Sequence, residues 1–423
     1  MPTYRELLRT PEFTPFFLVC SVQVAAATVS GLALATLVYA ATGSPLLSAL
    51  SMFGASFTQV IGASLLMSAA DRLPPRAATT AIAAAFAAGT ALLATPGLPV
   101  GAAFAVLLSQ GLIASVGGGV RYGLLNEILP KDRYLLGRSV LNMSTGTMQI
   151  CGFAVGGVLV TALSPRGTLL AGAALYAAAA AVARLRLARR PPRAQGRPSV
   201  SETWHVNSRL WACSSRRRLY LGLWVPNGLI VGCESLFVPY APEHAGLLFA
   251  AAAVGMLAGD TVTGRFLPAS WRGRLPVPLL LLLAGPYLLP ALHPALPLAV
   301  AAVALASVGY AASLLQQERL MALTPDAMTG QALGLHSSGM LTFQGIGAAV
   351  AGTLAQRTSP GTAMALTAAA SIAVTLALAA GSGRIRGPRR PVGSGAAHHS
   401  RCPGREGSMA DTAWCREDGR VAG

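Results

Sequence analysis

This sequence has few charged residues. Only 11% of its 423 residues are charged, and fifteen residues are acidic, whereas a soluble protein would carry about a quarter charged residues. Apolar runs of roughly twenty residues recur along the chain, the length that spans a bilayer core of about 30 Å. Because these runs do not alternate in polarity, they predict helices and not the strands of a membrane barrel. The composition excludes a soluble protein and predicts an all-α, multi-pass membrane protein.

The sequence also lacks the motifs of nucleotide hydrolysis and of catalysis. Its single lysine, Lys131, precedes Asp132, so no Gly-rich phosphate loop ends in Gly-Lys. There is no His-Glu-x-x-His and no Gly-x-Ser-x-Gly, and the six cysteines have no paired spacing. We therefore expect no catalytic residues, no cofactor, no metal site and no disulfide framework. An enzyme is not predicted.

Basic residues are in surplus, with a net charge of +17. When twelve spans are placed on the sequence, the Lys and Arg residues fall in loops on one side, and the exceptions are Arg166 and Arg357. This distribution follows the positive-inside rule and assigns that side, with both termini, to the cytoplasm. The charge thus indicates orientation in the lipid bilayer, and no nucleic-acid partner is expected.

The chain repeats itself. Residues 152–165 and 347–360 share seven of fourteen positions without a gap, and the same offset of 195 residues places Gln149 on Gln344. A repeat this long predicts two similar helical halves, each of six spans, related by an axis along the membrane normal. The predicted spans are roughly 16–39, 46–70, 77–94, 100–120, 141–163, 168–182, 219–238, 246–262, 275–289, 296–315, 333–355 and 363–380.

The predicted organisation has four parts. Residues 1–183 and 219–383 form the two six-helix bundles. Residues 184–218 are rich in arginine and proline and read as a basic cytoplasmic linker. Residues 384–423 lose all apolar periodicity, so we expect a disordered basic tail. The dominance of Ala, Arg, Gly and Pro is typical of a GC-rich, actinobacterial genome.

Three segments resemble the major facilitator superfamily, in particular its twelve-span branch of macrolide-efflux and siderophore-export relatives. Residues 42–45 (Thr-Gly-Ser-Pro) look like the external turn after the first span. Residues 71–76 (Asp-Arg-Leu-Pro-Pro-Arg) are similar to the cytoplasmic gating loop. The fifth predicted span carries a glycine ladder like that of the exporters: Gly146, Gly152, Gly156 and Gly157.

The sequence departs from the family pattern at several positions. Met67 stands where the gating loop has its first glycine, and Pro74-Pro75 replaces a Gly-Arg pair. Phe153 occupies the place of the proline that follows a ladder glycine in antiporters. These changes weaken the implication of proton antiport and leave transport as such untouched.

The resemblance implies roles for the gating loop. Asp71 steadies the outward-open state, and Arg72 and Arg76 pair with acids across the gate; the alternative is that the arginines only set topology. Asp260 and Arg265 stand in the corresponding region of the second half. A structural salt bridge, with Arg265 or with a gate residue, is the favoured interpretation for Asp260.

The ladder glycines and their copies, Gly347 and Gly352, have a packing interpretation, because small residues let helices approach closely in membranes. Gln149 and Gln344 would place amides inside spans, where a polar group needs a partner or a water-filled cavity. Facing a central pathway and hydrogen bonding between helices are both open for them.

Glu234 is the one acid placed more than a turn inside a span, in the outer half of the seventh. A carboxylate there costs several kcal/mol if ionised, so binding of a proton or of a cationic substrate group stands beside a structural protonated acid. Asn227 lies seven residues earlier, on the same predicted helix face. His336, near the cytoplasmic start of the eleventh span, titrates near neutral pH, although a structural role is the alternative.

Together, the resemblance implies a secondary transporter of the bacterial cell membrane that exports small amphipathic molecules by alternating access, coupled to protons. A uniporter or importer and a non-transporting, receptor-like protein are the alternatives. We expect a monomer whose partners are the small-molecule substrate, protons and the lipid bilayer.

Overall fold

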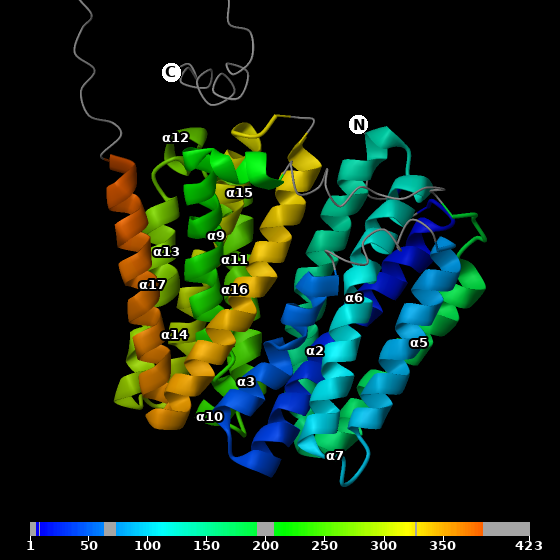
Figure 1. The fold of residues 1–423 in the computed structure, drawn as a ribbon, viewed down its shortest axis with the longest axis horizontal. Helices are drawn as coiled ribbons and strands as arrows, with labels where there is room; N and C mark the ends of the chain where they lie inside the picture. Colours follow the sequence, from blue (N-terminus) through cyan, green and yellow to red (C-terminus); the bar gives the residue numbers. More distant parts are fainter. Residues whose placement is uncertain (1–5, 8, 63–72, 193–206, 326–327, 384–423) are drawn as a thin grey trace, which may run out of the picture.

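The chain forms two helical bundles that stand side by side (Figure 1). The computed structural model describes residues 6–7, 9–62, 73–192, 207–325 and 328–383. Within these ranges every regular element is a helix, as the composition predicted. The first bundle ends at Arg186 and the second begins at Ser214.

The first bundle is built from long apolar helices. They are α2 (Phe13–Thr42), α3 (Pro45–Phe53) with its continuation to Gly62, α5 (Pro75–Leu93), α6 (Val100–Ile128) and α7 (Lys131–Arg186). The turn from α2 to α3 explains the Thr-Gly-Ser-Pro segment. Gly43 ends α2 in the left-handed region (φ 62°), and Ser44 caps α3 by accepting the N–H of Leu47 at 3.2 Å, with Pro45 in the first helical turn.

Helix α7 is two antiparallel helices joined without a loop. Ser164 inside it has non-helical angles (φ 73°, ψ 161°), and Pro165 follows at once. Proline lacks the N–H that would continue the hydrogen-bond ladder, so the chain turns back here. The two arms correspond to the fifth and sixth predicted spans.

The second bundle has shorter and more broken elements. They are α9 (Ser214–Glu234), α10 (Phe237–Tyr240), α11 (Ala245–Phe266), α12 (Ala269–Arg272), α13 (Pro276–Ala284), η1 (Gly285–Leu292), α14 (Leu296–Val308), η2 (Gly309–Ala311), α15 (Ala312–Ala322), α16 (Thr329–Arg357) and α17 (Pro360–Gly383). The ninth predicted span is interrupted as its prolines suggest, since α13 passes into the 3₁₀ helix η1 at Gly285 and Pro286.

Nine helices among the described residues are long and apolar enough to cross a membrane. One of them, Ser144–Arg186, accounts for two crossings because it folds back at Ser164. The shorter apolar segment Pro276–Leu292 and the 29-residue α16 complete six crossings in each bundle. The predicted twelve-span, two-bundle architecture therefore agrees with the observed fold.

The boundaries were predicted less well. Helix α7 begins at Lys131, about ten residues before the predicted fifth span, directly after Pro130. Its second arm continues to Arg186, and α9 begins at Ser214, so both helices extend into the stretch predicted as linker. Residues 193–206 of that linker and the whole predicted tail, 384–423, lie outside the described residues.

Candidate functional site

The two bundles touch through a pair of glycines. A methyl group on Gly157 of α7 would come to 2.9 Å from Cα of Gly246 in α11. Their repeat counterparts make a matching contact, since a methyl group on Gly352 of α16 would lie 2.7 Å from Cα of Leu46 in α3. The fifth span of one half thus packs on the second span of the other half, in both directions, as a parallel pseudo-two-fold requires.

Aromatic and polar contacts reinforce this junction. Phe153 of α7 stacks on Phe249 of α11 with ring centres 4.5 Å apart and planes 12° apart. On the other side of the pseudo-two-fold, the side-chain amide of Gln356 donates to the Ser44 hydroxyl at 2.6 Å. Leu32 of α2 is 1% exposed and belongs to the apolar core of the second bundle. The bundles are therefore tightly joined at this end.

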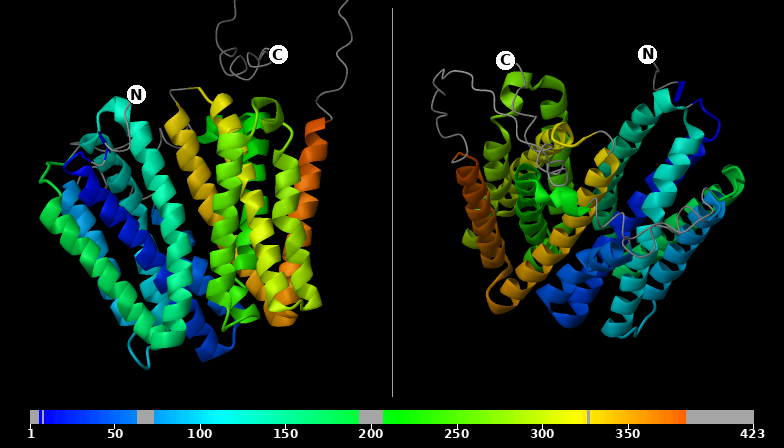
Figure 2. Two further views of the ribbon diagram at one scale, coloured as in Figure 1. Left: turned by 180° about the vertical axis from the view of Figure 1, so that it is seen from behind. Right: turned by 45° about the horizontal axis from the view of Figure 1, so that its top comes forward.

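These contacts lie at one end of the molecule, away from the basic loops. Arg166 and Arg357, the exceptions to the charge asymmetry, lie at the turns of that same end. Toward the opposite end, where α2 begins and α17 ends, the bundles diverge (Figures 1 and 2). The structure is closed at the end away from the basic loops and splayed at the end that carries them. By the positive-inside rule we expect these to be the outer and the cytoplasmic side, and we name them accordingly.

Other ladder glycines pack helices within a bundle. A methyl group on Gly152 would lie 2.9 Å from Cβ of Thr28 in α2, and one on Gly156 would lie 3.4 Å from Cα of Val29. In the second bundle, Gly347 of α16 contacts Gly228 of α9 backbone to backbone. The packing prediction is wrong for Gly146, because nothing among the described residues lies within 4 Å of a methyl group placed there.

Glu234 ends α9 and is buried, with 8% of its surface exposed. The Tyr310 hydroxyl of η2 donates to its Oε1 at 3.2 Å, and Tyr287 of η1 interacts with it electrostatically. No basic side chain pairs with this carboxylate among the residues that the structure describes. The sequence gives no sign of the two tyrosines, because only the fold of the second bundle brings them to α9.

Asn227 and Glu234 do not share a site. Asn227 is 4% exposed, and its side-chain oxygen accepts from the Gln344 amide of α16 at 3.5 Å, whereas Glu234 faces η2. Seven residues of helix separate the two by about 10 Å along the axis, and their partners come from different helices. Gln149, the repeat counterpart of Gln344, is exposed on α7.

The remaining predicted residues of the second half lie apart from Glu234. His336 is 5% exposed, and its backbone oxygen accepts from the Trp224 indole at 3.0 Å. Asp260 and Arg265 are both exposed on α11 and make no salt bridge within the described ranges. Asp260 does not pair with Arg265, because residues five apart lie on different faces of a helix, whereas neighbours are three or four apart. A salt bridge between Asp260 and a gate residue stays a prediction, since Arg72 lies outside the described residues.

The predicted gating loop is only partly described. Asp71 and Arg72 lie outside the described residues. Arg76 is the second residue of α5, at the cytoplasmic end of the first bundle, next to the start of the predicted third span.

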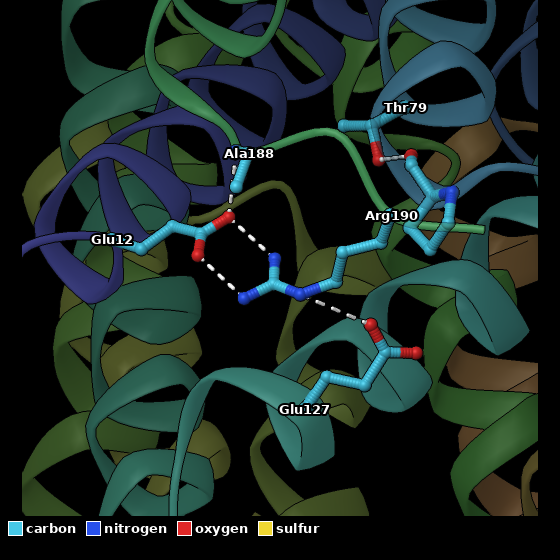
Figure 3. Close-up of polar contacts among 6 residues, drawn as sticks. Glu12, Thr79, Glu127, Ala188 and Arg190 are labelled. Carbon is cyan, nitrogen blue, oxygen red and sulfur yellow. Dashed lines mark hydrogen bonds and ion pairs between the residues drawn. The ribbon is translucent and has the colours of Figure 1, made fainter.

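An ion network that the sequence did not reveal lies at the cytoplasmic end of the first bundle (Figure 3). Both guanidinium NH groups of Arg190 donate to the Glu12 carboxylate at 2.6 Å, and its Nε lies 3.4 Å from Glu127. The N–H of Ala188 also donates to Glu12, at 2.8 Å. Glu12 and Arg190 are 178 residues apart, so only the fold reveals the pair.

The network changes the titration of Glu12, which directly precedes α2. Burial alone would raise the pKa of Glu12, but the hydrogen bonds from Arg190 and Ala188 and the positive charge of Arg190 outweigh it. The pKa of Glu12 therefore lies below its ordinary value. The carboxylate is held ionised, joining the start of α2 to the chain that follows α7.

This arrangement of two bundles is shared with known proteins. The sequence profile described as Major Facilitator Superfamily matches residues 16–312. This chain belongs to that superfamily. Among curated protein sequences none matches it significantly.

Solved structures agree with the superfamily assignment. A bacterial homologue of the human lysosomal transporter Spinster, in an inward-facing and unoccupied conformation, has a TM-score of 0.69 at 13% identity, covering 90% of this chain and 96% of its own. The nucleoside transporter NupG has a TM-score of 0.68 at 14% identity, covering 87% and 99%. The peptide transporter POT in complex with alafosfalin has a TM-score of 0.68 at 14% identity, covering 91% and 99%. At these identities the likeness establishes the fold.

Superfamily membership indicates a multi-pass membrane transporter and not an enzyme. The superfamily fold relates the joined end of the two bundles to their diverging end. The glycine and aromatic contacts hold the bundles together at one end and the bundles diverge at the other, a geometry from which the two halves can rock.

Proposed function

We propose that this protein exports small amphipathic molecules across the bacterial cell membrane by alternating access, driven by protons. The proposal is supported by the fold, by the inter-bundle contacts gathered at the outer end, and by Glu234. Rocking of the bundles would break the contacts between Gly157 and Gly246 and between Phe153 and Phe249, and would close the cytoplasmic side instead.

The observation that carries proton coupling is the burial of Glu234 with no basic partner among the described residues. An ionised carboxylate in such a place costs several kcal/mol unless it is paired. The Tyr310 hydroxyl provides a single hydrogen bond at 3.2 Å, which is too little to offset that cost. We infer that Glu234 carries a proton in this inward-facing conformation and releases it when the surroundings change.

A row of aromatic rings supports a link between Glu234 and the outer junction. Tyr287 stacks on Phe237 at 6.3 Å, and Phe237 meets Phe249 edge to face at 4.8 Å. Phe249 in turn stacks on Phe153 of the other bundle. Because close-packed interiors transmit strain, a shift of Tyr287 on deprotonation of Glu234 would reach the contact between the bundles.

The other predicted residues take supporting roles in this proposal. Asn227 and Gln344 form a polar pair between α9 and α16 that we assign to substrate contact or helix positioning on the pathway. The gating loop, with Asp71, Arg72 and Arg76, is proposed to hold the cytoplasmic side closed in the outward-facing state. The protein is proposed to work as a monomer, because each chain holds both halves of the pathway.

The test is accumulation of two probes, ethidium and erythromycin, in bacterial cells that express the wild type or Glu234→Gln. We expect the wild type to lower accumulation, an uncoupler to abolish that effect, and Glu234→Gln to resemble uncoupled cells. Glu318→Gln, at an exposed acid paired with Arg272, is the control and should behave like the wild type.

Each other outcome removes a stated part of the proposal. Equal efflux by the wild type and Glu234→Gln, with equal sensitivity to the uncoupler, would exclude Glu234 as the coupling acid. Efflux that is unaffected by the uncoupler would favour a uniporter. Raised accumulation in wild-type cells would indicate transport into the cell instead of out of it.

A further inference from the structure

The first bundle contains a partly open cavity that the central pathway does not explain. It has a volume of about 200 Å³ and lies among α2, the helix Pro45–Gly62, α5, α6 and the second arm of α7. These helices are the first to fourth and the sixth spans, so the cavity sits inside one bundle and not between the two. Its walls are mostly apolar, including Leu34, Met52, Phe86 and Leu107.

Polar residues from five helices line this cavity: Ser30, Gln59, Thr90, Gln110 and Tyr176. Two of them, Gln59 and Gln110, are among the isolated polar residues of the apolar runs. Within the described part of the chain the lining has no acidic, basic or histidine side chain. The site therefore suits an uncharged molecule that has both an apolar body and a polar group.

The hydrogen bonding of these groups is incomplete. Gln110 is 8% exposed, and its side-chain nitrogen donates to the Phe86 oxygen at 3.3 Å and to the Thr90 hydroxyl at 3.4 Å. Among the described residues its oxygen makes no hydrogen bond, and the Ser30 hydroxyl is buried without a partner. Buried polar groups are rarely left unpaired, and in a membrane bundle the cost is higher still.

Glycines make room for these side chains. A methyl group on Gly89 of α5 would lie 2.7 Å from the amide nitrogen of Gln110, and one on Gly172 of α7 would collide with the Ser30 hydroxyl. The polar groups are thus accommodated by the neighbouring helices.

We propose that the first bundle binds a small, uncharged, single-ring molecule with one hydrogen-bonding group in this cavity. An engineered cavity of about 150 Å³ holds benzene, so the present volume accommodates one substituted ring. The ring lies against Phe86 and Tyr176, which are themselves in ring contact at 5.2 Å, and its polar group bonds to Gln110. Binding here goes beyond the export proposed above, because it requires neither transport nor coupling.

The test is ligand-detected fluorine NMR on the purified protein in lipid nanodiscs, with 4-fluorophenol as the probe. We expect saturable broadening with the wild type that is lost in Ala114→Leu, which fills the cavity from α6. Ala105→Leu, at an exposed position of the same helix, is the matched control and should bind like the wild type. Gln110→Leu should weaken the binding of 4-fluorophenol by roughly two- to tenfold, as expected for the loss of one hydrogen bond. The binding of fluorobenzene should not change.

The contrary results are equally definite. Absence of saturable 4-fluorophenol binding by the wild type would mean that the cavity holds water only. Equal broadening in Ala114→Leu would mean partition into lipid, and equal binding of 4-fluorobenzoate would contradict an uncharged site; each overturns the proposal. Size-exclusion profiles confirm folding, and Ala27→Leu at the exposed rim replaces Ala114→Leu if that variant does not fold.

Discussion

Gly157 and Gly246 lie back to back across the boundary of the two bundles, with no room for a methyl group between them. Each comes from a different half, and neither has a side chain that could yield. The contact therefore exists only while the outer side is closed.

A bulky residue at Gly157 should open the outer side. In Gly157→Leu the added side chain meets the α11 backbone, so we expect the population to move toward the outward-open state. The measurement is the distance, by electron paramagnetic resonance, between spin labels at Thr161 and Glu243 in a background without the native cysteines. Gly146→Leu, on the same helix and with open space around it, should leave the distance distribution unchanged; a matching change in both variants would refute the role of the glycine pair.

The stack of Phe153 on Phe249 should stabilise the same closed state. Ring pairs of this kind contribute about 0.5–1.5 kcal/mol beyond their buried area. We predict that Phe153→Ala and Phe249→Ala each favour outer opening, and that the double variant opens less than the sum of the two. The label distances provide a double-mutant cycle, and strict additivity would show that the rings do not interact functionally.

The ion network at Glu12 predicts a pH-dependent stability. Because the pKa of Glu12 is lowered in the folded protein, its contribution is complete above the ordinary value of about 4.3 and is lost as pH falls through the lower folded value. At pH 7, Glu12→Gln should cost about 1 kcal/mol, since the pair is only partly screened by solvent.

Thermal unfolding of the purified protein at pH 7 and pH 3 measures this. The difference between the wild type and Glu12→Gln should shrink at pH 3, and an undiminished difference would contradict the assignment. Glu318→Gln serves as the control, because its Arg272 pair is 57% exposed at the acid and should contribute little at either pH.

The sequence predicted the architecture well and the site poorly, for identifiable reasons. Span length follows from local composition, and the 195-residue repeat follows from comparing the two halves of the sequence. Both could therefore be predicted without a structure. The repeat even anticipated equivalent neighbours, since Gly157 and Gly352 each face the opposite half. The turn at Ser164 lies between the predicted fifth and sixth spans, 141–163 and 168–182.

The contacts of individual side chains could not be predicted from composition or from the repeat. Tyr310 and Tyr287 reach Glu234 through the packing of broken helices, and Arg190 reaches Glu12 from 178 residues further along the chain. Asn227 was assigned to the face of Glu234 from helical periodicity alone, but each residue turns to a different neighbour. Periodicity predicts a face of a helix and does not predict which helix will cover it.

Proton movement in proteoliposomes tests the central claim most directly. Wild type and Glu234→Gln are reconstituted with a pH-sensitive dye inside, and ethidium or erythromycin is added under an imposed pH gradient. Coupling through Glu234 predicts that substrate drives proton flux with the wild type, and that Glu234→Gln exchanges substrate without moving protons. Substrate-driven proton flux of equal size in both proteins would contradict it.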